Sequence, residues 1–164
     1  MTAEGEKAEA GGLARAERTK LCTIGYERAG LAGFVAALQA AGVATLIDVR
    51  SVPWSQRPEF RQDPLRKSLL AAGIGYVHIR ALGNPKEGRE AAKAGNDATY
   101  RRHMAAQLAS ADGQKGLARV AELARKGPVS LMCYERDPAH CHRSLVADEL
   151  DARGLGAARH LFAS

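Results

Sequence analysis

Carboxylates, a histidine and a cysteine stand at or directly after the ends of short apolar runs in this sequence. Carboxylates and histidine can act as general acids and bases, and a carboxylate can stabilise an oxocarbenium-like state. A cysteine thiolate can act as a nucleophile. The candidate catalytic residues are Glu27, Asp48, His78, Cys133 and Glu135.

The carboxylates also have a structural interpretation, in which they form ion pairs with neighbouring arginines. Asp48 and Arg50 are the pair that favours this interpretation most, because residues two apart on a strand project to the same side. An ion pair at that position would anchor the loop after the strand.

Arginines and aromatic residues surround the same segments. The arginine fork binds phosphate through paired hydrogen bonds, and an aromatic ring can stack on a base. The single tryptophan, Trp54, lies in a polar loop bounded by prolines (SVPWSQRP), although it could instead fold back onto the core. The candidate substrate-binding residues are Tyr26, Arg50, Ser51, Trp54, Arg80, Arg136, His142 and Arg143.

Two opposing influences act on the pKa of the Cys133 thiol. A helix start and the nearby Arg136, Arg143 and His142 favour the thiolate. The apolar strand before Cys133 and the carboxylate after it raise the thiol pKa. We therefore favour a carboxylate over Cys133 for the chemistry, and a Cys133-dependent thiol enzyme remains the alternative.

Cys133, Cys141 and His142 are residue types that bind zinc. Their spacing contains no CxxC pair, and the sequence has only one such cluster. Cys141 is expected on the buried face of a helix that begins at Asp137. We predict no metal and no cofactor, and the lack of a GxGxxG or P-loop motif argues against a dinucleotide or a P-loop triphosphate.

The elements that must position these residues alternate along the chain. Strands are predicted at about 21–26, 45–49, 75–79, 129–133 and 159–162, with helices between them and a long polar connection at 83–96. This order predicts βαβ units in an α/β fold, a three-layer Rossmann-like sandwich with a mostly parallel sheet of about five strands. In such sheets ligands bind beyond the carboxyl ends of the strands, where the candidate residues stand.

Composition sets the remaining limits. Residues 1–19 are almost entirely Ala, Glu, Gly, Lys and Arg, which predicts a disordered tail before a single domain at 20–164. The net charge of +6 and the pI near 9.5 favour anionic small molecules or nucleic acid as partners. No apolar run is long enough to span a membrane, no signal sequence is present, and three cysteines make no disulfide framework, so we expect a cytoplasmic protein.

Four motifs resemble the domain-of-unknown-function family DUF488. They are TIGYE (23–27), IDVRSVPWSQRPEF (47–60), GIGYVHIRALGNP (73–85) and LMCYERDPAHCHRSLVADEL (131–150). The resemblance covers about residues 20–162. It implies a compact α/β domain and brings no catalytic residues with it.

The IDVR stretch and the strand–cysteine–loop–helix unit are also similar to rhodanese-like domains. A rhodanese loop places backbone donors directly after its cysteine. Here Glu135, Asp137 and Pro138 occupy that loop and would cradle an anion poorly. Sulfur transfer is therefore a minor alternative.

Three functions remain open from the sequence. The favoured one is an enzyme that acts on an anionic nucleotide or nucleic-acid substrate by hydrolysis or glycosidic transfer. The others are a thiol or rhodanese-like enzyme that uses Cys133, and a non-catalytic module that binds nucleic acid or another anion. The substrate, the reaction and the oligomeric state are not determined by these residues.

Overall fold

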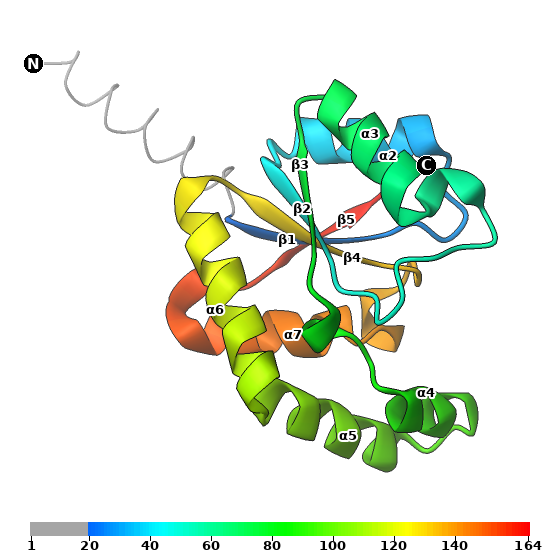
Figure 1. Cartoon of the computed structure of the whole chain (residues 1–164), viewed down its shortest axis with the longest axis vertical. Coiled ribbons are helices and arrows are strands. Elements are labelled where there is room, and N and C mark those ends of the chain that lie inside the picture. Colours follow the sequence, from blue (N-terminus) through cyan, green and yellow to red (C-terminus); the bar gives the residue numbers. More distant parts are fainter. Residues whose placement is uncertain (1–19) are drawn as a thin grey trace, which may run out of the picture.

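The fold is built on a five-stranded, entirely parallel sheet (Figure 1). A computed structural model describes residues 20–164. The strand order is β3-β2-β4-β1-β5. The strands are β1 (Leu21–Gly25), β2 (Thr45–Asp48), β3 (Gly75–His78), β4 (Val129–Cys133) and β5 (Arg159–Phe162).

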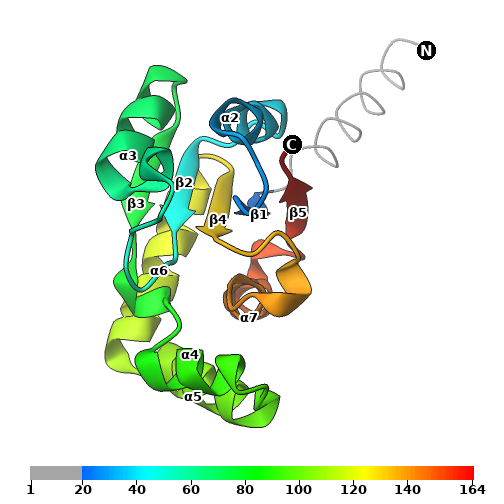
Figure 2. The same cartoon turned by 90° about the vertical axis from the view of Figure 1, so that its right-hand side faces the viewer.

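Helices cover both faces of the sheet. Figure 2 shows α2 and α3 on one side and α6 and α7 on the other, which confirms the predicted α/β sandwich of three layers. The helices are α2 (Leu31–Ala40), α3 (Gln62–Ala71), α4 (Lys86–Lys93), α5 (Asp97–Ala109), α6 (Ala111–Lys126) and α7 (Arg143–Leu150).

Two apolar clusters fill the space between these layers. Phe34 of α2 and Leu69 of α3 pack on one face of the sheet, and Val120 of α6 and Val146 of α7 pack on the other. Strands β1 and β4 are buried along their whole length, as parallel strands covered on both faces require. Their near-continuous apolar sequences follow from that double coverage.

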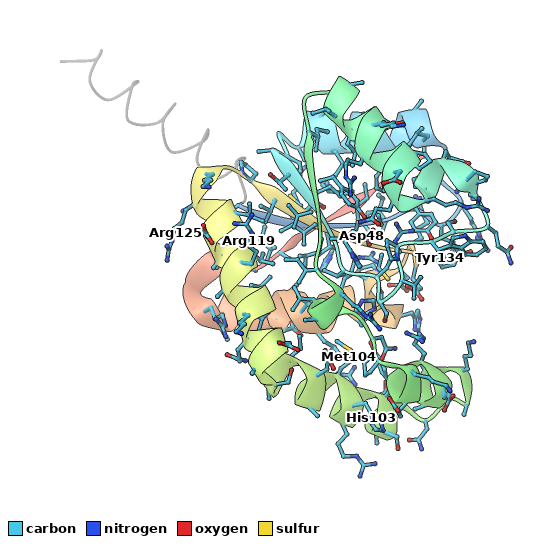
Figure 3. All side chains as sticks on the ribbon, in the orientation of Figure 1. Asp48, His103, Met104, Arg119, Arg125 and Tyr134 are labelled. Atoms are coloured by element: carbon cyan, nitrogen blue, oxygen red, sulfur yellow. The ribbon has the colours of Figure 1, made fainter. Side chains whose placement is uncertain are left out.

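Helices α4 and α5 pack against each other and project away from the sheet (Figure 1). Helix α4 lies inside the stretch predicted as a polar connection, so that prediction was wrong. Most of its residues are exposed, and its only buried residues are Gly88 and Ala91, so the stretch lacks the large apolar side chains that mark a core-facing helix in a sequence. Met104 of α5 is buried on the side that faces the sheet (Figure 3).

The segment after Asp137 also differs from the prediction. Asp137 caps only a short 3-10 helix at Pro138–His140, and α7 begins later, at Arg143. Cys141 is therefore extended backbone between the two helices rather than a residue on a helix face. This difference decides what Cys141 contacts.

Within residues 20–164, no helix has both the length and the apolar character that crossing a membrane requires. The predicted tail at 1–19 lies outside the described residues.

Candidate functional site

A cavity of about 370 Å³ lies beyond the carboxyl ends of β1, β2 and β4. Neighbouring parallel strands bring these ends together, as the sequence led us to expect. Figure 3 shows Tyr134, which also lines this cavity, near the end of β4 and beyond Asp48. Seven candidate residues line the cavity: Tyr26, Arg50, Ser51, Trp54, Cys133, Glu135 and His142.

Asp48 and Arg50 form a buried ion pair beneath this cavity. The Arg50 Nη2 atom is 2.7 Å from Asp48 Oδ2, and its Nε donates to Asp48 Oδ1 at 2.9 Å. The Tyr76 hydroxyl donates to Asp48 Oδ2 at 2.5 Å. Both carboxylate oxygens of Asp48 thus accept hydrogen bonds from other side chains of the protein, which favours the structural role for Asp48.

Arg136 and Arg143 are also engaged by the protein rather than presented to a ligand. Arg143 has no exposed surface, and its guanidinium donates to the carbonyls of Glu135 and Arg136. Arg136 donates to the carbonyl of Ala163. These two arginines therefore shape the loop after β4, and their guanidinium groups are used for backbone carbonyls of the protein itself.

Glu27 fixes the same loop from the other side. Its Oε1 atom accepts a hydrogen bond from the backbone N–H of Arg136 at 3.1 Å. The loop is thereby attached to the segment after β1, which places Glu135 over the cavity. Glu27 is positioned as a support for Glu135, and it is absent from the cavity lining.

Gly25 allows this loop to approach β1. A Cβ atom on Gly25 would lie 1.8 Å from the Glu135 carbonyl oxygen. We expect Gly25→Ala to cost about 1–3 kcal/mol of unfolding free energy, because the loop or strand must move. Chemical denaturation measures this loss. Gly30→Ala is the control, since a Cβ at Gly30 meets no atom within 4 Å, and an equal cost in both variants would contradict the expectation.

Aromatic side chains form one wall of the cavity. Tyr26 stacks on Phe60 with ring centroids 4.6 Å apart, and Tyr134 meets Tyr26 edge-on at 5.2 Å. Trp54 is 54% exposed and lies under the Arg61 guanidinium. Trp54 is therefore presented to solvent at the cavity rather than folded onto the core.

A second and larger cavity, of about 810 Å³, adjoins the first. Both are lined by Ser51 and Arg89, and the Arg89 guanidinium donates to Ser51 Oγ at 2.8 Å. His78 and Arg80 line the larger cavity. The His78 Nε2 atom donates to the Arg50 carbonyl at 2.7 Å, so His78 is separated from Glu135 and belongs to a different part of the site.

Cys133, Cys141 and His142 form a compact buried cluster, with one ligand atom from each within 4.8 Å of the others. The His142 Nδ1 atom lies 3.6 Å from Cys133 Sγ and 3.9 Å from Cys141 Sγ. The His142 Nε2 atom is 2.7 Å from the Val49 carbonyl. A carbonyl only accepts hydrogen bonds, so Nε2 carries a proton and Nδ1 is the ring nitrogen that faces both sulfurs.

Two buried oxygen atoms at the site have no hydrogen-bond partner within residues 20–164. They are Oε2 of Glu135 and Oδ1 of Asn84, and both residues line the cavity. A buried polar atom without a partner costs about 1–3 kcal/mol. Such atoms beside an open cavity indicate a place where water or a ligand completes the hydrogen bonding.

Burial and nearby charge alter the ionisation of this cluster. Burial, and then the neighbouring Cys141, raise the pKa of Glu135 to about 7. Contact with Cys141, and then burial, raise the pKa of Cys133, in the direction expected from the sequence. Burial alone would raise the pKa of Cys141, but Cys133, His142 and Arg143 outweigh it and lower that pKa. Burial likewise opposes a charged His142, yet Cys141 raises the pKa of the imidazole overall.

Sequence reasoning missed three residues at the site: Asn84, Arg89 and Tyr100. Asn84 and Arg89 come from the stretch expected to be a polar connection. Tyr100 lies on α5 and lines a third cavity together with Glu135 and His142. The polar composition of 83–96 was the one signal that pointed to this stretch.

Comparison with known proteins gives one match. The family described as "Domain of unknown function DUF488" matches residues 30–150. A search of curated proteins and a search of solved structures each found no match.

Proposed function

The chain belongs to the DUF488 family, and we propose that it is a hydrolase for a phosphate-bearing nucleotide or nucleic acid, with Glu135 as the general base and acid. One observation carries this proposal. The Glu135 Oε2 atom is buried and lacks a protein partner within residues 20–164, and its side chain lines two adjoining cavities.

The larger cavity supplies the charge for the anionic part of such a substrate. Its basic residues Arg80, Lys86, Arg89 and Lys115 are accompanied by the single carboxylate of Asp112. All four basic side chains are exposed. Basic groups converging on a hollow attract phosphate through charge and donate hydrogen bonds to it.

The aromatic wall supplies a surface for a base. Trp54 and Tyr134 are exposed beside Glu135, although large apolar side chains are normally buried. Stacking on an aromatic ring is tolerant of base identity. A nucleotide whose phosphate lies in the larger cavity would therefore place its base or its scissile bond in the smaller one.

The reaction needs one water molecule and one positioned carboxylate. The Glu135 carboxylate takes a proton from water as the water oxygen bonds to the electrophilic atom of the substrate. The bond to the leaving group then breaks, and Glu135 returns the proton to that group. One water is consumed, and the carboxylate is regenerated.

The test replaces only the proton-transferring oxygen. We expect Glu135→Gln to lower hydrolysis by at least about 100-fold, the usual scale for a positioned acid or base. The rate is followed by chromatography of released base, phosphate or shortened oligonucleotide. The probes are nucleoside mono- and diphosphates and single-stranded DNA and RNA.

Glu122→Gln on α6 is the matched control, because Glu122 is 53% exposed and pairs only with Arg119 in the described chain. It should hydrolyse at the wild-type rate. Equal rates for Glu135→Gln and wild type would overturn the role of Glu135. A wild-type protein that binds none of the probes in low-salt calorimetry would overturn the substrate class.

A further inference from the structure

We infer that Cys133, Cys141 and His142 bind one zinc ion, with a fourth coordination position that opens toward the cavity beside Glu135. This inference deepens the proposed function, because it places a Lewis acid at the same site. Two thiolates and one imidazole are a donor set that suits Zn²⁺.

The distances fit a tetrahedral centre. Zn–S bonds of about 2.3 Å and Zn–N bonds of about 2.0–2.1 Å place a ligating nitrogen about 3.6 Å from each sulfur. The His142 Nδ1 atom lies 3.6 Å from Cys133 Sγ and 3.9 Å from Cys141 Sγ. Both nitrogen-to-sulfur distances are thus near the tetrahedral value, and all three donor atoms lie within 4.8 Å of one another.

The imidazole is oriented as a zinc ligand. Metal-binding histidines donate their other ring N–H to a carbonyl or carboxylate, which fixes the tautomer and the ring plane. The His142 Nε2 atom makes this contact with the Val49 carbonyl at 2.7 Å. The Nδ1 atom is then the ring nitrogen that faces the two sulfurs.

The environment stabilises negative charge on the Cys141 sulfur. The backbone N–H of Arg143 donates to Cys141 Sγ at 3.5 Å. The buried Arg143 guanidinium holds the adjoining loop through the Glu135 and Arg136 carbonyls. Arg143 is not one of the three proposed zinc ligands, and its N–H bond to Cys141 Sγ holds Cys141 in place.

The coordination sphere is of the open type. A structural zinc site usually has four protein ligands, whereas a catalytic site has three and an exchangeable water. Only three donors converge here among the described residues, and both Cys133 and His142 line the cavity that Glu135 also lines. The fourth position therefore falls next to the carboxylate that takes the proton from water.

The sequence does not predict this zinc site, because the three residues contain no CxxC pair and Cys141 is expected on the buried face of a helix. The extended backbone at Cys141 turns its sulfur toward Cys133 instead. Two adjacent thiols could instead form a reversible disulfide, which would lower the mass of the protein by the two hydrogen atoms that are lost.

The experiment uses the full chain, reduced, stripped with a chelator and desalted. We expect zinc to rebind at one equivalent per chain, as measured by elemental analysis. Substitution with Co²⁺ should give thiolate-to-cobalt charge-transfer absorption and the intense visible bands of a tetrahedral site. Zinc should also raise the thermal midpoint, because it binds only the folded state.

Cys133→Ser and Cys141→Ser should each weaken zinc binding by more than the roughly 10–100-fold that loss of an outer-shell partner costs. Both should lose the cobalt charge-transfer band. Cys22→Ala is the matched control, since Cys22 is a buried cysteine in the opposite apolar cluster, and it should bind zinc like the wild type. Circular dichroism checks that each variant is folded. If a serine variant unfolds, the cobalt spectrum and the zinc stoichiometry of the wild type and Cys22→Ala decide the proposal.

Two outcomes would overturn the zinc site. One is a reduced wild type that binds no stoichiometric zinc. The other is isolation of a Cys133–Cys141 disulfide, 2 Da lighter, whose reduced form gives no cobalt charge-transfer band. Stoichiometric zinc with an unaffected Glu135→Gln rate would uphold the site and refute the proposed function. A hydrolysis rate that depends on Glu135 in a protein that binds no zinc would refute the zinc site and uphold the proposed function.

Discussion

Asp48→Ala should lower the free energy of unfolding by about 3–5 kcal/mol. Asp48 has no exposed surface, and the Arg50 guanidinium beside it is only 6% exposed. Removing the carboxylate leaves the buried charge of Arg50 without its counter-ion. Breaking a buried pair on one side costs far more than the pair itself contributes.

Two variants test this explanation. Asp63→Ala removes a carboxylate whose pair with Arg66 is exposed, so it should change stability by less than about 1 kcal/mol. Removing both buried partners, as Asp48→Ala with Arg50→Met, should recover part of the loss, because no charge remains buried. Urea denaturation measures all three. A double variant less stable than Asp48→Ala would show that the cost has another origin.

Arg143→Ala should destabilise the domain by at least about 3 kcal/mol. Arg143 is the largest fully buried side chain in residues 20–164. Its removal leaves a cavity and takes hydrogen bonds from the carbonyls of Glu135 and Arg136. The loop that carries Glu135 would lose its support at the same time.

Arg143→Lys separates charge from shape. A lysine keeps the charge but lacks the planar fork that reaches two carbonyls at once. We expect it to recover less than half of the stability lost in Arg143→Ala, as measured by denaturation. Arg125→Ala, on the exposed last turn of α6, is the control and should fall within about 0.5 kcal/mol of wild type. Full rescue by lysine would mean that charge alone matters at this position.

The sequence by itself determined the sheet and the end of the sheet at which the candidate site residues gather. The five strand segments are short apolar or β-branched runs separated by turn residues, and these patterns follow from local propensity and burial. Because the carboxyl ends of parallel strands meet at one edge of a sheet, the sequence pattern predicts that Cys133 and Glu135 lie near Arg50. The motifs identified the family for the same reason, since each is a contiguous stretch.

Only the tertiary structure decided which charged side chains are already bonded to other groups of the protein. Nothing in the sequence distinguishes Arg80 from three other candidate arginines: Arg50, Arg136 and Arg143. In the structure, those three donate hydrogen bonds to Asp48 or to backbone carbonyls. Whether a guanidinium is occupied depends on carbonyls and carboxylates far away in sequence. No spacing rule contains that information.

The Cys133, Cys141 and His142 cluster was decided in the same way. Cys141 is buried in the apolar core as the sequence predicts, but the backbone that carries it is extended, not helical, and its sulfur lies beside Cys133 and His142. The Val49 carbonyl, 93 residues away in sequence, orients the imidazole. Local propensity selects the strands, whereas the directions of the side chains at their ends depend on long-range contacts that only the folded chain brings together.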